Sequence, residues 1–209
     1  MNERNFKTEQ EAFWAGEFGD EYIRRNQSDE LLASNLNFFA TVLRRTRGLN
    51  SCIEFGANIE MNLRALKQLH PGLDMHGVEI NAEAARVLAD IIPRQNIVND
   101  SLLDFKPERV WDLVLIKGVL IHINPDSLKR AYDTLVQSAG RYLLVAEYYN
   151  RTPVSIPYRG HSDRLFKRDF AGEILDQFPE LALVDYGFSY HRDPNFPQDD
   201  ITWFLMERG

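Results

Sequence analysis

The sequence predicts an α/β protein built on a doubly wound, mainly parallel β-sheet. Between residues 49 and 146, short apolar runs alternate with helix-like segments, and the connections between them are short. The run Trp111–Ile116 ends in four consecutive apolar residues, which is typical of a strand buried on both faces. Near the C-terminus, Leu181–Tyr190 and Thr202–Glu207 are strand-like with no helix between them, so we expect an antiparallel pair.

The chain begins with a polar segment of helical periodicity. In residues 1–48, aromatic and apolar side chains recur about every four positions, first between Phe13 and Ile23 and then over Leu31–Leu43. Gly48 ends this pattern. We expect residues 1–48 to form a helical lid on a core of residues 49–209, all within one domain of residues 1–209.

The expected core contains seven strands and four helices. The strands are Ser51–Phe55, Met75–Ile80, Asn96–Val98, Trp111–Ile116, Tyr142–Ala146, Leu181–Tyr190 and Thr202–Glu207. The helices are Met61–Leu69, Ala82–Ile92, residues 124–136 and residues 169–178. His70-Pro71-Gly72 ends the first of these helices and Pro93 ends the second.

The composition narrows the class of protein. With 44% hydrophobic and 26% charged residues it is an ordinary globular chain, and a net charge of −7 disfavours nucleic acid as a partner. No apolar run approaches the roughly 18 residues of a membrane span, and the N-terminus lacks a secretory pattern. The single cysteine, Cys52, excludes an internal disulfide, so we expect a cytoplasmic protein with Cys52 buried in a strand.

The ends of the first two strands carry groups suited to a nucleotide. In open α/β sheets, ligands bind outside the carboxyl ends of the strands, where the strand order reverses. We assign Glu54, Gly56 and Asn58 of the first turn to cofactor binding, because Gly56 lets the backbone approach a ligand closely. Glu79 closes the second strand, where a carboxylate accepts both hydroxyls of a ribose. Alanine at position 79 is then expected to weaken cofactor binding and to change the stability of the ligand-free protein very little.

The third strand ends in Asp100 and Ser101, which suit the edge of an adenine. Two nucleotide cofactors fit this geometry. A nicotinamide dinucleotide requires G-x-G-x-x-G, because its pyrophosphate sits on a helix N-terminus. The run here lacks the second and third glycines and places Glu60 at the helix start, where a carboxylate repels pyrophosphate. S-adenosylmethionine has no phosphate and carries a positive sulfonium, so the sequence favours it.

Four segments together resemble a known family: FWAGEFGDEYIRRN (13–26), IEFGANIEMNLRAL (53–66), DLVLIKGVLIHINP (112–125), and EYYN (147–150) with PYRGHSDRLFKRDF (157–170). Over residues 50–209 the chain resembles class I S-adenosylmethionine-dependent methyltransferases. It is more closely similar to the pseudaminic acid biosynthesis-associated methylases. This resemblance implies a Rossmann-like, seven-stranded sheet in a bacterial, cytoplasmic methyltransferase that accompanies nonulosonic-acid sugar pathways.

The resemblance also implies roles for individual residues. Trp14 and Tyr22 are expected to close over the cofactor, and Arg25 to reach its carboxylate. The chain departs from the family pattern at Glu60, where a small residue, usually glycine, stands. Because carboxylates stabilise helix N-termini, we expect that replacing Glu60 with glycine lowers the stability of the ligand-free protein slightly and leaves cofactor binding unchanged or tighter.

The fourth strand delivers further groups to the same edge of the sheet. We assign the backbone of Lys117, Gly118 and Val119 to cofactor binding. His122 follows, and its ordinary pKa makes it the natural general base for removing a proton from an acceptor. The alternative interpretation of His122 is a histidine at a helix entry, bonded to the backbone.

The fifth strand ends at Glu147-Tyr148-Tyr149-Asn150, which places two tyrosines at the end of a strand. We assign Tyr148 to catalysis and Tyr149 to the wall of the acceptor pocket, with core packing as the alternative for both. The five histidines of the chain include no i, i+4 pair, so a metal site has little support.

Residues 159–168 form a basic stretch, with four full positive charges against one negative charge. We expect Arg159, His161 and Arg164 to clamp a carboxylate or phosphate of a small acceptor. The alternative is a solvated stretch before the helix 169–178. There, Lys167 and Arg168 stand at a helix start, where cations are unfavourable unless something compensates them.

The leading hypothesis from the sequence is a methyltransferase that uses S-adenosylmethionine and acts on a small, anionic metabolite. A second hypothesis is a non-catalytic S-adenosylmethionine-binding module that keeps the fold without turnover. A third, a nicotinamide-dependent oxidoreductase, is disfavoured by the missing glycines.

Overall fold

The seven strands of the main sheet are arranged in the order β3-β2-β1-β4-β5-β9-β8. The computed structural model describes residues 6–16, 18–19, 28–161 and 164–209. The strands are β1 (Ser51–Phe55), β2 (Asp74–Val78), β3 (Ile97–Val98), β4 (Trp111–Lys117), β5 (Ala139–Glu147), β8 (Leu181–Ser189) and β9 (Ile201–Arg208). β1 is parallel to both β2 and β4, whereas β9 is antiparallel to both β5 and β8. The predicted doubly wound α/β sheet with an antiparallel C-terminal pair is therefore confirmed.

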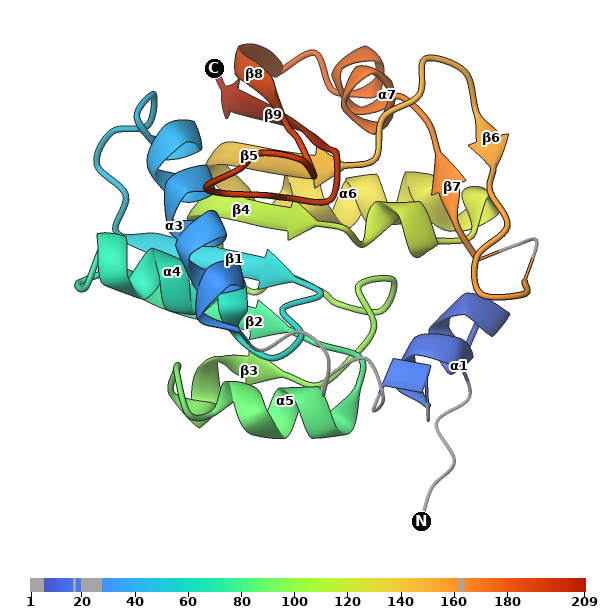
Figure 1. Ribbon diagram of the computed structural model, residues 1–209, viewed down its shortest axis with the longest axis horizontal. Helices are drawn as coiled ribbons and strands as arrows, with labels where there is room; N and C mark the ends of the chain where they lie inside the picture. The colour runs from blue at the N-terminus through green and yellow to red at the C-terminus, as the bar shows by residue number, and fades with distance from the viewer. Residues whose placement is uncertain (1–5, 17, 20–27, 162–163) are drawn as a thin grey trace.

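Helices cover both faces of this sheet (Figure 1). They are α1 (Glu9–Ala15), α3 (Asp29–Leu43), α4 (Met61–Leu69), α5 (Ala82–Leu88), α6 (Leu128–Ser138) and α7 (Phe170–Gln177). Leu113 and Leu115 of β4 pack with α3, α4 and α5, while Val114 and Ile116 pack with α6 and α7. All four side chains are fully buried, as the continuous apolar run predicts. Within the described ranges, no helix is long and apolar enough to cross a membrane.

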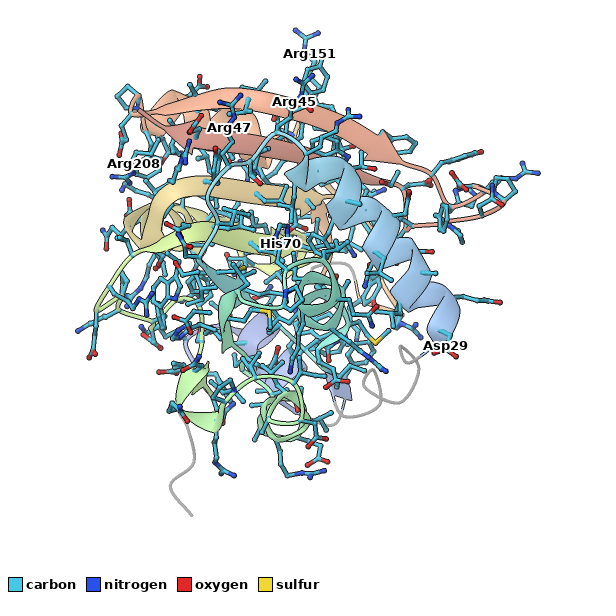
Figure 2. All side chains as sticks on the ribbon, turned by 90° about the vertical axis from the view of Figure 1, so that its left-hand side faces the viewer. Asp29, Arg45, Arg47, His70, Arg151 and Arg208 are labelled. Carbon is cyan, nitrogen blue, oxygen red and sulfur yellow. The ribbon has the colours of Figure 1, made fainter. Side chains whose placement is uncertain are left out.

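The helices of the N-terminal segment lie in different places: α3 in the core and α1 at the edge of the sheet. The Ser28 hydroxyl begins α3 by accepting the Leu31 N–H at 3.1 Å. Phe38, Phe39 and Val42 then lie in the core against β1 and β4. Figure 2 shows α3 crossing this face of the sheet from Asp29, with Arg45 and Arg47 in the loop that follows it. α3 is thus part of a core layer rather than of the expected lid.

α1 occupies a different place, at the edge toward which the parallel strands point in Figure 1. A capping box begins this helix: the Thr8 hydroxyl accepts the Glu11 N–H at 3.1 Å, and the Glu11 carboxylate accepts the Thr8 N–H at 2.9 Å. Of the residues expected to form a lid, those of α1 have the lid position.

A second, two-stranded sheet follows β5 and was not predicted. It pairs β6 (Val154–Ser155) with β7 (Phe166–Lys167). Lys167 therefore lies in a strand and not at a helix start. Arg168 donates from Nε to a Glu173 carboxylate oxygen at 2.6 Å, and this ion pair compensates its position before α7.

Candidate functional site

A cavity of about 440 Å³ opens at the carboxyl ends of β1, β2 and β4. Its volume lies in the range of small-molecule sites, roughly 300–1,000 Å³. The walls come from the loops after β1, β2, β3 and β4, from α1 and α3, and from the loop between β8 and β9. Segments from the whole chain thus meet at the edge where the strand order reverses, as expected for a ligand site in this fold.

The loop after β1 has an alternating backbone pattern. Gly56, Asn58 and Glu60 all have positive φ, at +73°, +45° and +85°, and only the first is a glycine. A Cβ at position 56 would overlap the Val119 side chain, so glycine lets this loop pack on the loop after β4. Gly56 and Asn58 line the cavity.

Glu60 has a different role from the one predicted. It is the N-cap of α4 in the left-handed conformation, and its side chain makes no capping hydrogen bond. Glycine favours this conformation, so the expectation that glycine at position 60 lowers stability is reversed by the backbone geometry. The described residues that line the cavity do not include Glu60.

Glu79 joins the loops after β1 and β2. One carboxylate oxygen accepts the Asn58 N–H at 2.7 Å and the other accepts the Asn81 N–H at 2.8 Å. The side chain is 7% exposed, and this burial raises its pKa. Each oxygen can accept one further hydrogen bond, so the carboxylate is still able to receive two ribose hydroxyls. It also holds the backbone of both loops, which the sequence does not indicate.

The loop after β3 is tied to α1. The Ser101 hydroxyl donates to the Glu11 carboxylate and accepts the Leu103 N–H at 3.0 Å. Asp100 accepts the Ser101 N–H at 2.8 Å, and both Asp100 and Ser101 line the cavity. Glu11 also lines the cavity. It was not predicted as a site residue, although the spacing from Thr8 to Glu11 is a recognisable capping box.

The loop after β4 brings His122 into the cavity wall. Its Nδ1 lies 2.6 Å from the carbonyl oxygen of Arg164, and its ring centroid lies 4.6 Å from that of Trp14, which also lines the cavity. Burial lowers the pKa of His122 to about 4. A neutral imidazole that faces a carbonyl through Nδ1 carries its hydrogen there, so Nε2 is left as an acceptor.

Two buried carboxylates lie behind the cavity wall, and one of them, Glu147, holds the loop after β4. Glu147, at the end of β5, accepts the N–H groups of Val119 and Leu120 at 3.0 and 2.9 Å, and burial raises its pKa to about 7. Glu54 accepts a hydrogen bond from the Asn62 amide at 2.6 Å, and burial raises its pKa to about 8. The described residues that line the cavity include Asn62 but neither carboxylate.

Tyr148 and Tyr149 are not among the described residues that line the cavity. Tyr148 is half-buried against the core with the Lys167 ammonium 5.0 Å from its ring, and Tyr149 is 41% exposed beside Phe204. The catalytic role predicted for Tyr148 therefore gains no support from the described cavity wall. Tyr22 and Arg25 lie outside the described residues.

The three residues of the expected anion clamp contact the N-terminal helical segment instead. The Arg159 guanidinium lies 5.7 Å from the Phe18 ring, and the His161 ring lies 5.4 Å from the Phe13 ring. Arg164 donates to the Glu9 carboxylate of α1 at 3.1 Å. None of the three is among the described residues that line the cavity.

No metal centre is evident in the described part of the chain, where no three His, Cys, Asp or Glu side chains cluster in a way that could hold an ion. Cys52 is fully buried in β1, as predicted.

Comparisons with known proteins place this fold. No protein-family model matches the sequence, and no curated protein matches it. Many solved structures match the fold. Magnesium protoporphyrin IX methyltransferase from Synechocystis PCC 6803, crystallised with bound S-adenosylmethionine, is 14% identical, with a TM-score of 0.66 over 98% of this chain and 100% of that chain. The sugar N-methyltransferase KedS8 from Streptoalloteichus is also 14% identical, with a TM-score of 0.64 over 93% of each chain.

A third similar structure is the N-methyltransferase NodS from Bradyrhizobium japonicum, with 14% identity and a TM-score of 0.61 over 84% of this chain and 96% of that chain. At these identities the likeness is one of fold. It agrees with the predicted Rossmann-like sheet with an antiparallel C-terminal pair.

Proposed function

We propose that this protein is an S-adenosylmethionine-dependent methyltransferase that acts on a small molecule. The observation that carries the proposal is the position of Glu79 in the cavity wall, at the end of β2. Its two oxygens are held by backbone N–H groups, and each retains a lone pair for a ribose hydroxyl. The fold shared with structures of methyltransferases supports the same cofactor.

The charges of the cavity support a cofactor without phosphate. Five lining residues carry a carboxylate and one carries an ammonium, Lys117, among those that the structure describes. A pyrophosphate in this cavity would face an excess of negative charge, whereas a positive sulfonium is attracted to it. Glu60 occupies the N-cap position of α4, and a carboxylate there is likewise unfavourable for a pyrophosphate.

Different residues of the described cavity wall would contact different parts of such a cofactor. Glu79 would hold the ribose, Asp100 the adenine edge, and the loop containing Gly56 and Asn58 would lie under the rest of the molecule. When bound, S-adenosylmethionine supplies a methyl group already activated for in-line displacement. The protein then needs to align the acceptor and to receive its proton, and the neutral His122 has a free Nε2 for that proton.

The acceptor is proposed from the resemblance in sequence. The likeness to methylases of nonulosonic-acid pathways makes intermediates of those bacterial, cytoplasmic pathways the first molecules to assay. These sugars are anionic, but the clamp expected at Arg159, His161 and Arg164 loses support, because these residues contact the N-terminal helical segment. An anionic group on the acceptor therefore needs another partner.

Calorimetry with S-adenosylhomocysteine and with NADH tests the proposed cofactor. Binding of the first without the second is expected, and binding of NADH alone would identify a nicotinamide enzyme instead. Transfer of labelled methyl groups to sugar-acid intermediates then tests turnover. Binding of S-adenosylhomocysteine with no transfer to any acceptor would favour the non-catalytic module, although Glu60, the departure that suggested it, does not line the cavity among the described residues.

A further inference from the structure

Lys117 stands at the end of β4, in the centre of the sheet edge, and its side chain points toward α3. Along β4, Leu113 and Leu115 pack on the α3 side, and Lys117 continues this alternation. Its ammonium lies 5.6 Å from the centroid of the Phe38 ring of α3. Lys117 also lines the cavity, so its ammonium lies where the cavity meets α3.

Among the residues that the structure describes, this ammonium has no hydrogen-bond partner and no close ion pair. Glu54, Asp199 and Glu147 attract it, but within the described chain no carboxylate lies within 4.0 Å of Lys117 Nζ. Lysine brings three donors, and taking an ammonium from water without partners is costly. Burial accordingly lowers the pKa of Lys117. A cation held in a cavity wall with unused donors is suited to an anionic ligand group.

A polar side chain of α3, that of Asn35, lines the same cavity as Lys117. Asn35 is 1% exposed and lies one turn before Phe38 on the same face of α3. Its side-chain oxygen accepts a hydrogen bond from the Gln198 amide at 3.0 Å, which joins α3 to the loop between β8 and β9. This bond leaves the Asn35 amide nitrogen as a second donor in the cavity wall, within the part of the chain that the structure describes.

We infer that the Lys117 ammonium and the Asn35 amide form a carboxylate-binding subsite at the α3 end of the cavity. The inference rests on the proposed function only for the identity of the ligand. Two carboxylates suit the subsite: that of the amino-acid part of S-adenosylmethionine, and that of an acidic acceptor such as a nine-carbon sugar acid. Lys117 would then hold the anionic group that the sequence analysis assigned to Arg159, His161 and Arg164, which are not among the described lining residues.

Calorimetry on wild type, Lys117→Met and Lys117→Arg tests the subsite, with Lys129→Met on the surface of α6 as the matched control. Lys129 pairs with Asp133 at 2.9 Å, and it is not among the described residues that line the cavity. The first ligands are S-adenosylhomocysteine and 5′-methylthioadenosine, which shares the nucleoside but lacks the amino-acid part. The second are N-acetylneuraminic acid and its methyl ester, titrated into protein with and without saturating S-adenosylhomocysteine.

If the cofactor supplies the carboxylate, Lys117→Met lowers the affinity for S-adenosylhomocysteine by about tenfold or more and leaves the affinity for methylthioadenosine unchanged. If the acceptor supplies it, the variant loses the preference of wild type for the acid over the ester. In both cases Lys117→Arg retains most of the wild-type preference for the ligand that carries the carboxylate, and Lys129→Met retains all of it.

The inference is overturned if Lys117→Met keeps the wild-type ratio of affinities within both pairs of ligands. This includes the case in which wild type itself binds the acid and the ester equally well. Failure of the proposed function has a different signature, since wild type would then bind neither S-adenosylhomocysteine nor methylthioadenosine. The comparison of acid with ester on ligand-free protein still decides the subsite in that case.

Discussion

His122 Nδ1 and the main-chain carbonyl oxygen of Arg164 lie 2.6 Å apart, across 42 positions of sequence. The contact joins the loop after β4 to the segment before β7 and fixes the orientation of the imidazole in the cavity wall. It also requires a hydrogen on Nδ1, which leaves Nε2 as the acceptor. The ring is neutral near pH 7, because burial lowers the pKa of His122 to about 4.

The first prediction concerns acid stability. In the unfolded chain His122 takes up a proton near its ordinary pKa of about 6.5, but in the folded protein only near 4. The free energy of unfolding should therefore fall as the pH drops from 6.5 to 4, by up to roughly 2 kcal/mol at pH 4.5. His122→Asn, which keeps a donor for the Arg164 carbonyl, should lack this component.

Urea unfolding of both proteins at pH 7 and pH 4.5 measures the difference. Equal losses in wild type and in the variant would show that His122 is protonated as readily in the folded protein as in the unfolded chain.

The second prediction concerns Glu60. Its φ of +85° costs a non-glycine residue on the order of 1 kcal/mol, and Glu60 offers no capping bond in return. Glu60→Gly should raise the free energy of unfolding by about 0.5–1 kcal/mol after the greater flexibility of glycine in the unfolded chain is counted. Glu60→Ala keeps the strain and is the matched control. A glycine variant no more stable than the alanine variant would refute the strain argument.

Glu60 shows what the sequence could and could not predict in this region. Residues 51–55 and 61–69 were predicted as strand and helix with the observed bounds, because their apolar periodicity is strong. Between them the backbone is left-handed at several positions, and there Gly56 packs against Val119, which lies in the loop after β4. Such long-range packing has no local sequence signal, so the sequence placed Glu60 at the helix start without indicating its left-handed backbone.

The third prediction concerns Glu79. Glu79→Ala removes two charge-assisted hydrogen bonds to backbone N–H groups and leaves those groups buried without an acceptor. The free energy of unfolding of the ligand-free protein should fall by about 2 kcal/mol or more, contrary to the expectation from the sequence. Affinity for S-adenosylhomocysteine should fall about tenfold or more as the ribose loses its partner.

Thermal unfolding and calorimetry measure the two effects separately. Glu83→Ala, on the exposed side of α5, is the control and should change neither. A Glu79 variant with reduced stability and wild-type affinity would place the ribose elsewhere.

The fourth prediction concerns Glu54, which is fully buried and whose pKa burial raises to about 8. The folded protein holds a proton there that the unfolded chain releases above about pH 4.5, so wild type should lose stability as the pH rises toward 8. Glu54→Gln keeps the acceptor for the Asn62 amide and does not titrate. Its stability relative to wild type should increase by about 3 kcal/mol between pH 5 and pH 8.

Denaturant unfolding at the two pH values measures this change, with the exposed Glu108→Gln as control. A relative stability independent of pH would mean that Glu54 is ionised in the folded protein throughout this range.

The sequence predicted the parts of the site that follow directly from strand ends. Gly56, Glu79 and Asp100 each end or follow a predicted strand, so the order of the strands alone brings them to one edge. Glu11 and Gln198 come from a helix and a loop at opposite ends of the chain. Their places in the cavity depend on how α1 and the loop between β8 and β9 fold over the sheet, which no local pattern encodes.

The last prediction concerns Arg164 and Glu9. The sequence suggests that Arg164→Ala weakens the binding of the acceptor and leaves the affinity for the cofactor unchanged, because Arg164 was expected to hold an anion. In the structure Arg164 donates to Glu9 at 3.1 Å and so fastens α1, whose Glu11 and Trp14 line the cavity. Arg164→Ala should therefore lower the affinity for S-adenosylhomocysteine itself, and Glu9→Ala should lower it as well. Because the Glu9 side chain is 80% exposed, the coupling between the two should be modest, at most about 1 kcal/mol.

A double-mutant cycle on the affinity for S-adenosylhomocysteine measures that coupling. The double variant should lose less affinity than the sum of the single losses, since either substitution alone already breaks the ion pair. Arg159→Ala is the matched control, because Arg159 lies over the Phe18 and Tyr158 rings and pairs with no carboxylate in the described chain. If the single losses simply add, α1 is held by its other contacts, chiefly that of Glu11 with Ser101. If Arg164→Ala changes only the affinity for an acidic acceptor, Arg164 acts as the anion-binding residue after all.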